Sequence, residues 1–114
     1  MKKKKISAPF EMMVIIVERG KADKALEILQ AHDCTFTLTT LGQGTAQSET
    51  ADIFGFGIVD REVIWALASP IMSTKILDTL NNVLELEQPR HGIAMTIPVN
   101  SASNLMLDIM GINY

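Results

Sequence analysis

Two short glycine-containing turns hold the residues of this chain that are best placed to bind a ligand. The first turn is Gly42-Gln43-Gly44-Thr45 and the second is Arg90-His91-Gly92. Backbone amides in glycine turns can donate hydrogen bonds to an anion, and an arginine can pair with an anion through two parallel hydrogen bonds. The two turns together predict a phosphate-binding or ligand-binding cleft.

Each of these residues also has a plainer explanation. Gly42 and Gly44 suit a tight turn that needs positive φ, and a lone histidine in a loop is commonly only solvated. His91 could instead bind a metal ion. Arg90 is the strongest candidate for an anion contact, because it is held between a proline and Gly92.

The sequence contains no catalytic set. Neither histidine belongs to a recognisable nucleophile motif, and histidine and cysteine do not cluster at metal-ligand spacing. The chain is therefore predicted to be a binding and signalling module, not an enzyme.

Composition predicts one domain, residues 11–114, behind a flexible basic tail, residues 1–10. The chain has 114 residues, is 47% hydrophobic and carries a net charge of −3, with a pI of about 5.3. This acidity argues against nucleic-acid binding through phosphate neutralisation, and no apolar run is long enough for membrane insertion. Cys34 is the only cysteine, which suits a reducing cytoplasm and a packing role.

Hydrophobic periodicity predicts four strands and two helices. The strands are expected at residues 10–18, 35–41, 63–68 and 93–99, and the helices at residues 21–31 and 69–86, the second starting at Ser69-Pro70. A long loop covers residues 42–60, with one or two helical turns expected within residues 47–54. This order predicts an α+β, ferredoxin-like βαββαβ sandwich, in which two helices cover one face of a four-stranded antiparallel sheet.

The other face of that sheet must also bury apolar area. The first and third strands read as apolar on both faces, yet two helices can cover only one. Self-association of the uncovered faces is the expected solution. The segment 103–114 has apolar spacing and is expected to pack on a neighbour or on the sheet edge.

The chain resembles the nitrogen regulatory P-II proteins, and most closely their divergent, short-loop P-II-like branch. The motifs that carry the resemblance are Gly42-Gln43-Gly44-Thr45-Ala46 after the second strand and Gly92-Ile93-Ala94-Met95-Thr96-Ile97-Pro98-Val99 at the last strand. The resemblance implies a cytoplasmic homotrimer that binds an adenine nucleotide between subunits. It also implies a regulated partner, which is a transporter, an enzyme or a transcription regulator, in nitrogen metabolism.

Several positions depart from the pattern of that family. Thr45 and Ala46 stand where the family has a basic residue and a glutamine, and Ile93 stands where it has a phosphate-binding lysine. The arginines usually found after the last strand are replaced by residues 100–103. The only tyrosine is Tyr114, so the signalling loop has no acceptor for uridylylation. A ligand of lower charge than ATP is therefore expected.

Two other functions remain open at this stage. A trimeric divalent-metal-handling protein of the cation-tolerance type shares the predicted fold and would bind metal through His91 or loop carboxylates. A small-molecule enzyme of the dimeric ferredoxin-like barrel group is disfavoured by the missing catalytic residues.

Overall fold

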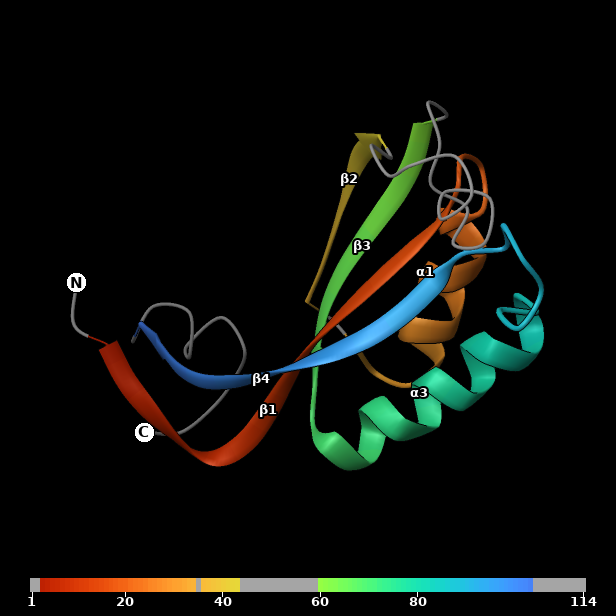
Figure 1. The fold of residues 1–114 in the computed structure, drawn as a ribbon. Coiled ribbons are helices and arrows are strands. Elements are labelled where there is room, and N and C mark those ends of the chain that lie inside the picture. Colours follow the sequence, from red (N-terminus) through yellow and green to blue (C-terminus); the bar gives the residue numbers. More distant parts are fainter. Residues whose placement is uncertain (1–2, 35, 44–59, 104–114) are drawn as a thin grey trace.

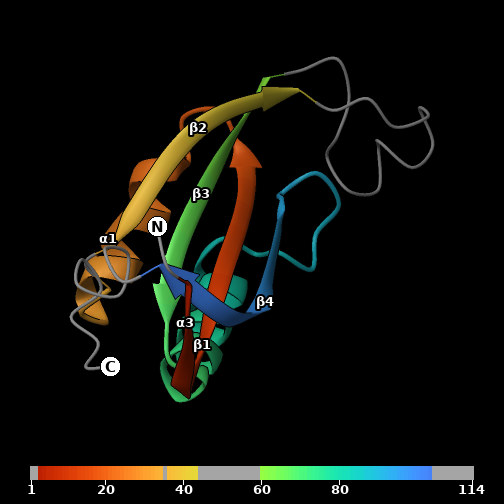
Figure 2. The ribbon, with the colours of Figure 1, turned by 90° about the vertical axis from the view of Figure 1, so that its left-hand side faces the viewer.

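The computed structural model describes residues 3–34, 36–43 and 60–103. Its elements are β1 (Lys3–Glu18), α1 (Ala22–Ala31), β2 (Thr37–Gln43), β3 (Asp60–Ala68), α3 (Pro70–Val83) and β4 (Ile93–Ser103). The strands form one antiparallel sheet in the order β2-β3-β1-β4. Both helices lie on the same side of the sheet (Figure 1), and they are behind it in the view of Figure 2. The predicted βαββαβ fold class is confirmed.

Local sequence signals explain where the helices begin and end. Helix α3 starts as predicted at Ser69-Pro70: the Ser69 hydroxyl accepts a hydrogen bond from Met72 N at 3.3 Å, and Pro70 occupies the first turn. Helix α1 begins after Lys21, which makes no side-chain cap. It ends at His32, whose Nδ1–H donates to Ile28 O at 2.8 Å.

The hydrophobic core lies between the helices and one face of the sheet. Alternate residues of β1 point into it, and the fully buried Met13 and Ile15 face the helices together with Ile64 of β3. Leu29 of α1 and Leu80 of α3 close the core from the other side with no exposed surface. The core is thus built from both helices and the two central strands.

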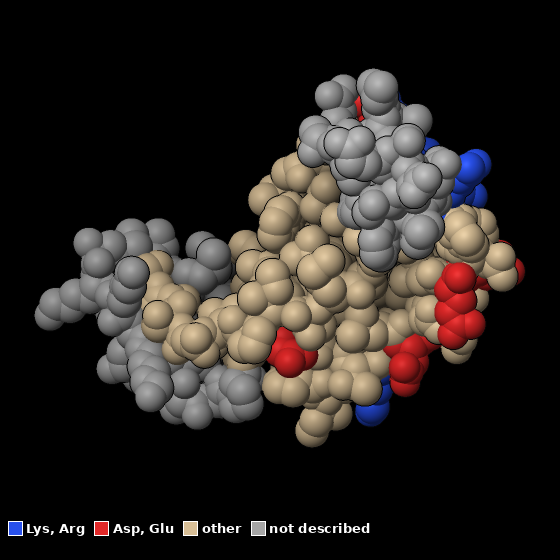
Figure 3. Space-filling model, in the orientation of Figure 1, with Lys and Arg blue, Asp and Glu red and all other residues tan. Residues whose placement is uncertain are grey.

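The opposite face of the sheet, which we call the open face, is also apolar. Its apolar residues, by the alternation of the paired strands, are Phe10, Met12, Val14, Ile16, Leu38, Val63, Trp65, Leu67, Ile93, Met95, Ile97 and Val99. Trp65 Nε1–H donates to Thr40 Oγ1 across this face at 3.4 Å. Its outer strands leave Leu38 56%, Met95 42% and Ile97 48% exposed. In Figure 3 most visible charged side chains lie on the helix side, away from the strands.

The first strand starts earlier in the sequence than predicted. Residues 1–10 were expected to form a flexible tail, but β1 begins at Lys3. The reason is that β4 continues beyond residue 99 to Ser103, so that Lys3, Lys4 and Lys5 find backbone partners there. The register shifts between Lys5 and Phe10, and the paired ends project away from the helices (Figure 1).

Other boundaries moved by a few residues. Strand β3 starts at Asp60, three residues before the prediction, because its first residues pair with the end of β2. Helix α3 ends at Val83 and not near residue 86. The expected helical turns at residues 47–54 and nearly all of segment 103–114 lie outside the described residues. Neither α1 nor α3, the helices of the described part, has the length and apolar character of a membrane span.

Candidate functional site

The first two residues of the predicted turn Gly42-Gln43-Gly44-Thr45 belong to a strand. Gly42 and Gln43 were expected to follow the second strand, but they are the last residues of β2 and pair with Arg61 and Asp60 of β3. Gly42 has no positive φ, and a Cβ there would meet Val63 Cγ2 at 3.4 Å. A tight-turn role for Gly42 is therefore wrong. Gly44 and Thr45, the other predicted ligand residues of this turn, lie outside the described residues.

The backbone conformation of the second turn explains why it contains a glycine. Arg90 has φ 72° and Gly92 has φ 123°. A Cβ on Gly92 would lie 2.3 Å from Ile16 O and 3.2 Å from Val17 Cα, which is closer than backbone atoms allow. Gly92 is thus required for the chain to pass against β1 as it enters β4.

His91 holds the second turn against the end of α3. Its Nδ1–H donates to Leu84 O at 3.2 Å, and the same nitrogen lies 3.9 Å from a carboxylate oxygen of Glu85. The His91 side chain is 39% exposed and Arg90 is exposed. Because Nδ1 is hydrogen-bonded to the backbone, Nε2 is the ring nitrogen of His91 that remains available to bind a ligand.

The two turns lie at the same end of the sheet but on opposite edges. Across the sheet, Gly42 of β2 pairs with Arg61 of β3, which pairs with Glu18 of β1. Two residues before Glu18, Ile16 of β1 pairs with Ile93 at the start of β4. Three strand spacings of roughly 4.8 Å separate β2 from β4, a distance of about 14 Å. Within one chain, therefore, the predicted ligand residues are not brought into contact.

Charged side chains whose contacts the sequence did not predict connect the elements at this end of the molecule. The Glu62 carboxylate of β3 accepts hydrogen bonds from Gly20 N and, at 3.4 Å, from Ala22 N, and so caps α1 from another element. Beside it, Arg19 and Asp60 form an ion pair at 3.1 Å. No local motif predicts these contacts, because the partners lie about 40 residues apart in sequence.

Next to this network is a polar hollow between the α1 start and the second turn. It is lined by Glu18, Lys21, Lys24, Val83, Leu84, Glu85 and His91. Both signs of charge are present, so the hollow has no strong preference for an anion. Within residues 3–34, 36–43 and 60–103, no three His, Cys, Asp or Glu side chains come together as metal ligands would.

Cys34 lies in the core and not at this site. The residue is 6% exposed and its thiol donates to Leu67 O at 3.2 Å. Burial raises the pKa of the Cys34 thiol above its ordinary value. The thiol therefore stays protonated near neutral pH, which fits the packing role predicted for it.

Comparison with known proteins identifies the fold. No family model and no curated protein matches the sequence. CPII from Thiomonas intermedia K12, bound to ADP, AMP and acetate, matches with a TM-score of 0.65 at 14% identity, over 93% of this chain and 96% of CPII. A second structure of CPII, described as a nitrogen regulatory PII-like protein and bound to ADP, AMP and bicarbonate, gives the same TM-score. This chain has the PII-like fold.

A further solved structure extends the likeness. The complex of B. subtilis GlnK with ATP has a TM-score of 0.65 and 15% identity, over 89% of this chain and 91% of GlnK. The resemblance inferred from the sequence motifs is thus confirmed at the level of the fold. The same fold holds ADP, AMP or ATP in those proteins.

Proposed function

We propose that this protein is a PII-like regulator that works as a homotrimer and binds an adenine nucleotide between subunits. Two proteins that share its fold have been solved with adenine nucleotides, CPII with ADP and AMP and GlnK with ATP. In this proposal nucleotide occupancy regulates a partner protein, which is a transporter, an enzyme or a transcription regulator, and the chain catalyses no reaction itself.

The observation that carries the proposal is the apolar open face. In a single chain the centre of the open face is buried, since Val14 is 6% and Leu67 is 8% exposed. On the outer strands of this face, Leu38, Met95 and Ile97 are about half exposed. Apolar area is worth roughly 25 cal/mol per Å² when removed from water. Contact between copies of the chain is the simplest way to bury these outer residues.

The placement of the two turns supports a site shared between subunits. They lie at one end of the sheet but on opposite edges, about 14 Å apart, so the two turns of one chain do not form a single compact site. When the β2 edge of one subunit approaches the β4 edge of the next, Gly42 and Gln43 of one chain come near Arg90 and His91 of the other. The proposed site also includes Gly44, Thr45 and the backbone of Gly92.

The residues of this site favour a ligand of low charge. Arg90 is the cation in the second turn, and the following strand begins with Ile93 and not with a lysine. Each hydrogen bond to a charged group contributes about 1.5–3 kcal/mol. A site that lacks several such contacts should bind a nucleoside monophosphate more tightly than a triphosphate.

The test is calorimetry on the full-length protein with ATP, ADP, AMP and a cyclic adenine nucleotide, together with native mass spectrometry. A trimer that binds AMP, and loses that binding in Arg90→Ala, is expected. Lys75→Ala is the matched control, because Lys75 is an exposed cation of α3 away from both turns. Tight magnesium-dependent ATP binding would overturn the charge argument. Absence of binding to every nucleotide would overturn the nucleotide-sensor function.

No contact among the described residues favours the metal-handling alternative. His91 donates to the backbone carbonyl of Leu84, and Glu62 and Asp60 are engaged with the α1 start and with Arg19. Native mass spectrometry in the presence of Zn²⁺ or Cu²⁺ tests this alternative in the same experiment.

A further inference from the structure

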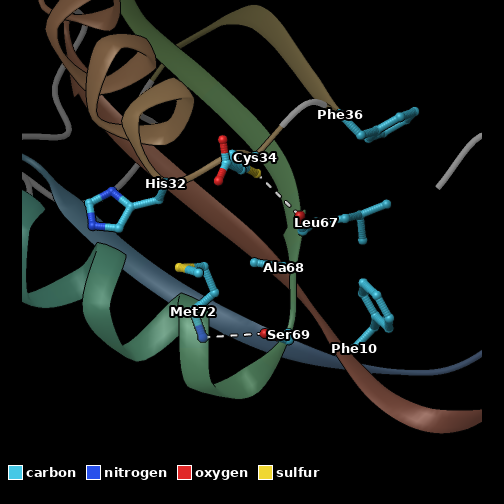
Figure 4. A pocket seen from close by; sticks show the side chains of 9 residues that line it. Phe10, His32, Cys34, Phe36, Leu67, Ala68, Ser69 and Met72 are labelled. Atoms are coloured by element: carbon cyan, nitrogen blue, oxygen red, sulfur yellow. Dashed lines mark hydrogen bonds between the residues drawn. The ribbon is translucent and has the colours of Figure 1, made fainter. Parts of the chain in front are cut away.

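A separate hollow opens at the other end of the sheet (Figure 4). Its volume is about 280 Å³, close to the lower limit of roughly 300 Å³ for small-molecule sites. The residues that line it are Phe10, His32, Asp33, Cys34, Phe36, Leu67, Ala68, Ser69 and Met72. Phe36 lies six residues before Gly42, a distance of about 20 Å along an extended chain. The hollow is therefore distinct from the proposed nucleotide site.

One end of the hollow is apolar. Phe36 and Phe10 stand on either side of Leu67, with Met72 and Ala68 nearer the helices (Figure 4). Phe10, Phe36 and Trp65 are the aromatic residues in the described part of the chain, and two of these three line this one hollow. In a single chain both phenylalanines are only partly buried, and a small molecule reaches their rings where the hollow opens at the end of the sheet.

The floor of the hollow carries no charged group. Cys34 and Leu67 are 6% and 8% exposed, and the thiol of the first already donates to the carbonyl of the second at 3.2 Å. The Ser69 hydroxyl accepts from Met72 N at the start of α3. Any preference for charge must therefore come from the remaining side of the hollow.

That side is electrostatically negative. Among the described residues of the lining, Asp33 is the only Asp, Glu, Lys or Arg. It directly follows the C-terminal end of α1, where the helix dipole is negative and the last turn holds no basic residue. His32 Nδ1–H donates to Ile28 O at 2.8 Å, so one ring nitrogen is held by the last turn of α1 and the other is left for a ligand. Aromatic faces also attract cations.

We propose that this hollow binds a small organic cation, namely an aromatic or branched aliphatic body that carries an ammonium group. The body packs between Phe10, Phe36 and Met72, and the ammonium group lies towards Asp33 and the end of α1. An adenine nucleotide, which is an anion, has the wrong charge for this site. The inference is thus independent of the proposed nucleotide function.

The experiment uses the full-length protein with methyl-labelled methionine and follows the methionine methyl signals by NMR. The probes are phenethylammonium, neutral 2-phenylethanol and anionic phenylacetate, which share a phenyl ring and differ in charge. Titration at about pH 8 keeps ordinary histidine side chains neutral. Phenethylammonium should shift the Met72 signal with millimolar affinity and should leave Met95, on the open face, unchanged.

Asp33→Asn tests the charge without disturbing the backbone. Asp33 has φ 58°, a conformation that asparagine also tolerates. The variant should weaken phenethylammonium binding about fivefold, the upper range for an exposed ion pair, and should leave 2-phenylethanol binding unchanged. Asp23→Asn, an exposed carboxylate in the first turn of α1, is the matched control and should change neither.

Three results would overturn the proposal. The first is the absence of a Met72 shift at millimolar phenethylammonium, as expected if another part of the protein already fills the hollow. The second is phenylacetate binding as tightly as phenethylammonium. The third is equal phenethylammonium affinity in Asp33→Asn and the unmodified protein.

Discussion

Replacement of Met95 by aspartate should dissociate the proposed trimer without unfolding the chain. Met95 lies on the open face of the outer strand β4 and is 42% exposed in a single chain. A carboxylate at this position therefore remains hydrated in a monomer. When open faces meet, the same carboxylate would be taken out of water among apolar side chains.

The magnitude follows from the cost of a buried unpaired charge. Removing one partner of a buried ion pair, which leaves such a charge, costs roughly 3–5 kcal/mol. Three symmetric copies of the substitution give about 9 kcal/mol at the low end of that range. Since each 1.4 kcal/mol is a factor of ten, the dissociation constant of the trimer should rise by about six orders of magnitude.

Light scattering coupled to size-exclusion chromatography, over a range of protein concentrations, measures the effect. Ile71→Asp is the control, because Ile71 is 74% exposed on α3, on the helix side of the molecule. An aspartate in the first turn of a helix is electrostatically favoured, so this variant should stay trimeric. The reasoning fails if Met95→Asp remains a trimer, or if the unmodified protein is a stable monomer at micromolar concentration.

Four further substitutions test the contacts that hold the fold. Gly92→Ala should lower the free energy of unfolding by more than about 3 kcal/mol, because its Cβ meets Ile16 O. Gly20→Ala, with φ 95° but open space around it, should cost only about 1–2 kcal/mol by urea denaturation, and equal losses would contradict the clash. Glu62→Gln should cost about 1 kcal/mol through loss of the charged cap on α1, and an unchanged urea midpoint would show that the cap is not needed. Cys34 should react with a thiol reagent only in denaturant. Because the pKa of its thiol is raised in the folded state, the free energy of unfolding should fall as pH rises past about 8.5, the ordinary thiol pKa. Cys34→Ala should lack this fall.

The sequence predicted the fold because its periodicities are local and strong. The apolar run in β1 and the Ser69-Pro70 helix start each depend on neighbouring residues, and both were placed correctly. The start of β1 at Lys3 could not be predicted in the same way. It depends on pairing with Ser103 at the far end of the chain, and no local pattern reports such a partner.

The candidate site was predictable only as a set of residue types. Arg90 and His91 are in a surface turn, as expected, but the role of His91 in holding Leu84 depends on the α3 end lying beside it. Gly92 was selected as a ligand residue, whereas its positive φ and its approach to Ile16 give it a structural reason. The capping of α1 by Glu62 had no sequence signal, because cap and helix come from different elements.

The strand order has a consequence for how the chain folds during synthesis. Strand β1 is made first and sits at the centre of the sheet, yet its neighbours are β3 and β4. Met13, for example, pairs with Ala66 and Thr96, which emerge from the ribosome much later. The most apolar segment of the chain therefore waits unpaired through most of translation. Sheets closed by such distant pairings fold slowly and are vulnerable to aggregation in that interval, so production of this protein should respond more to chaperone supply and growth temperature than its small size suggests.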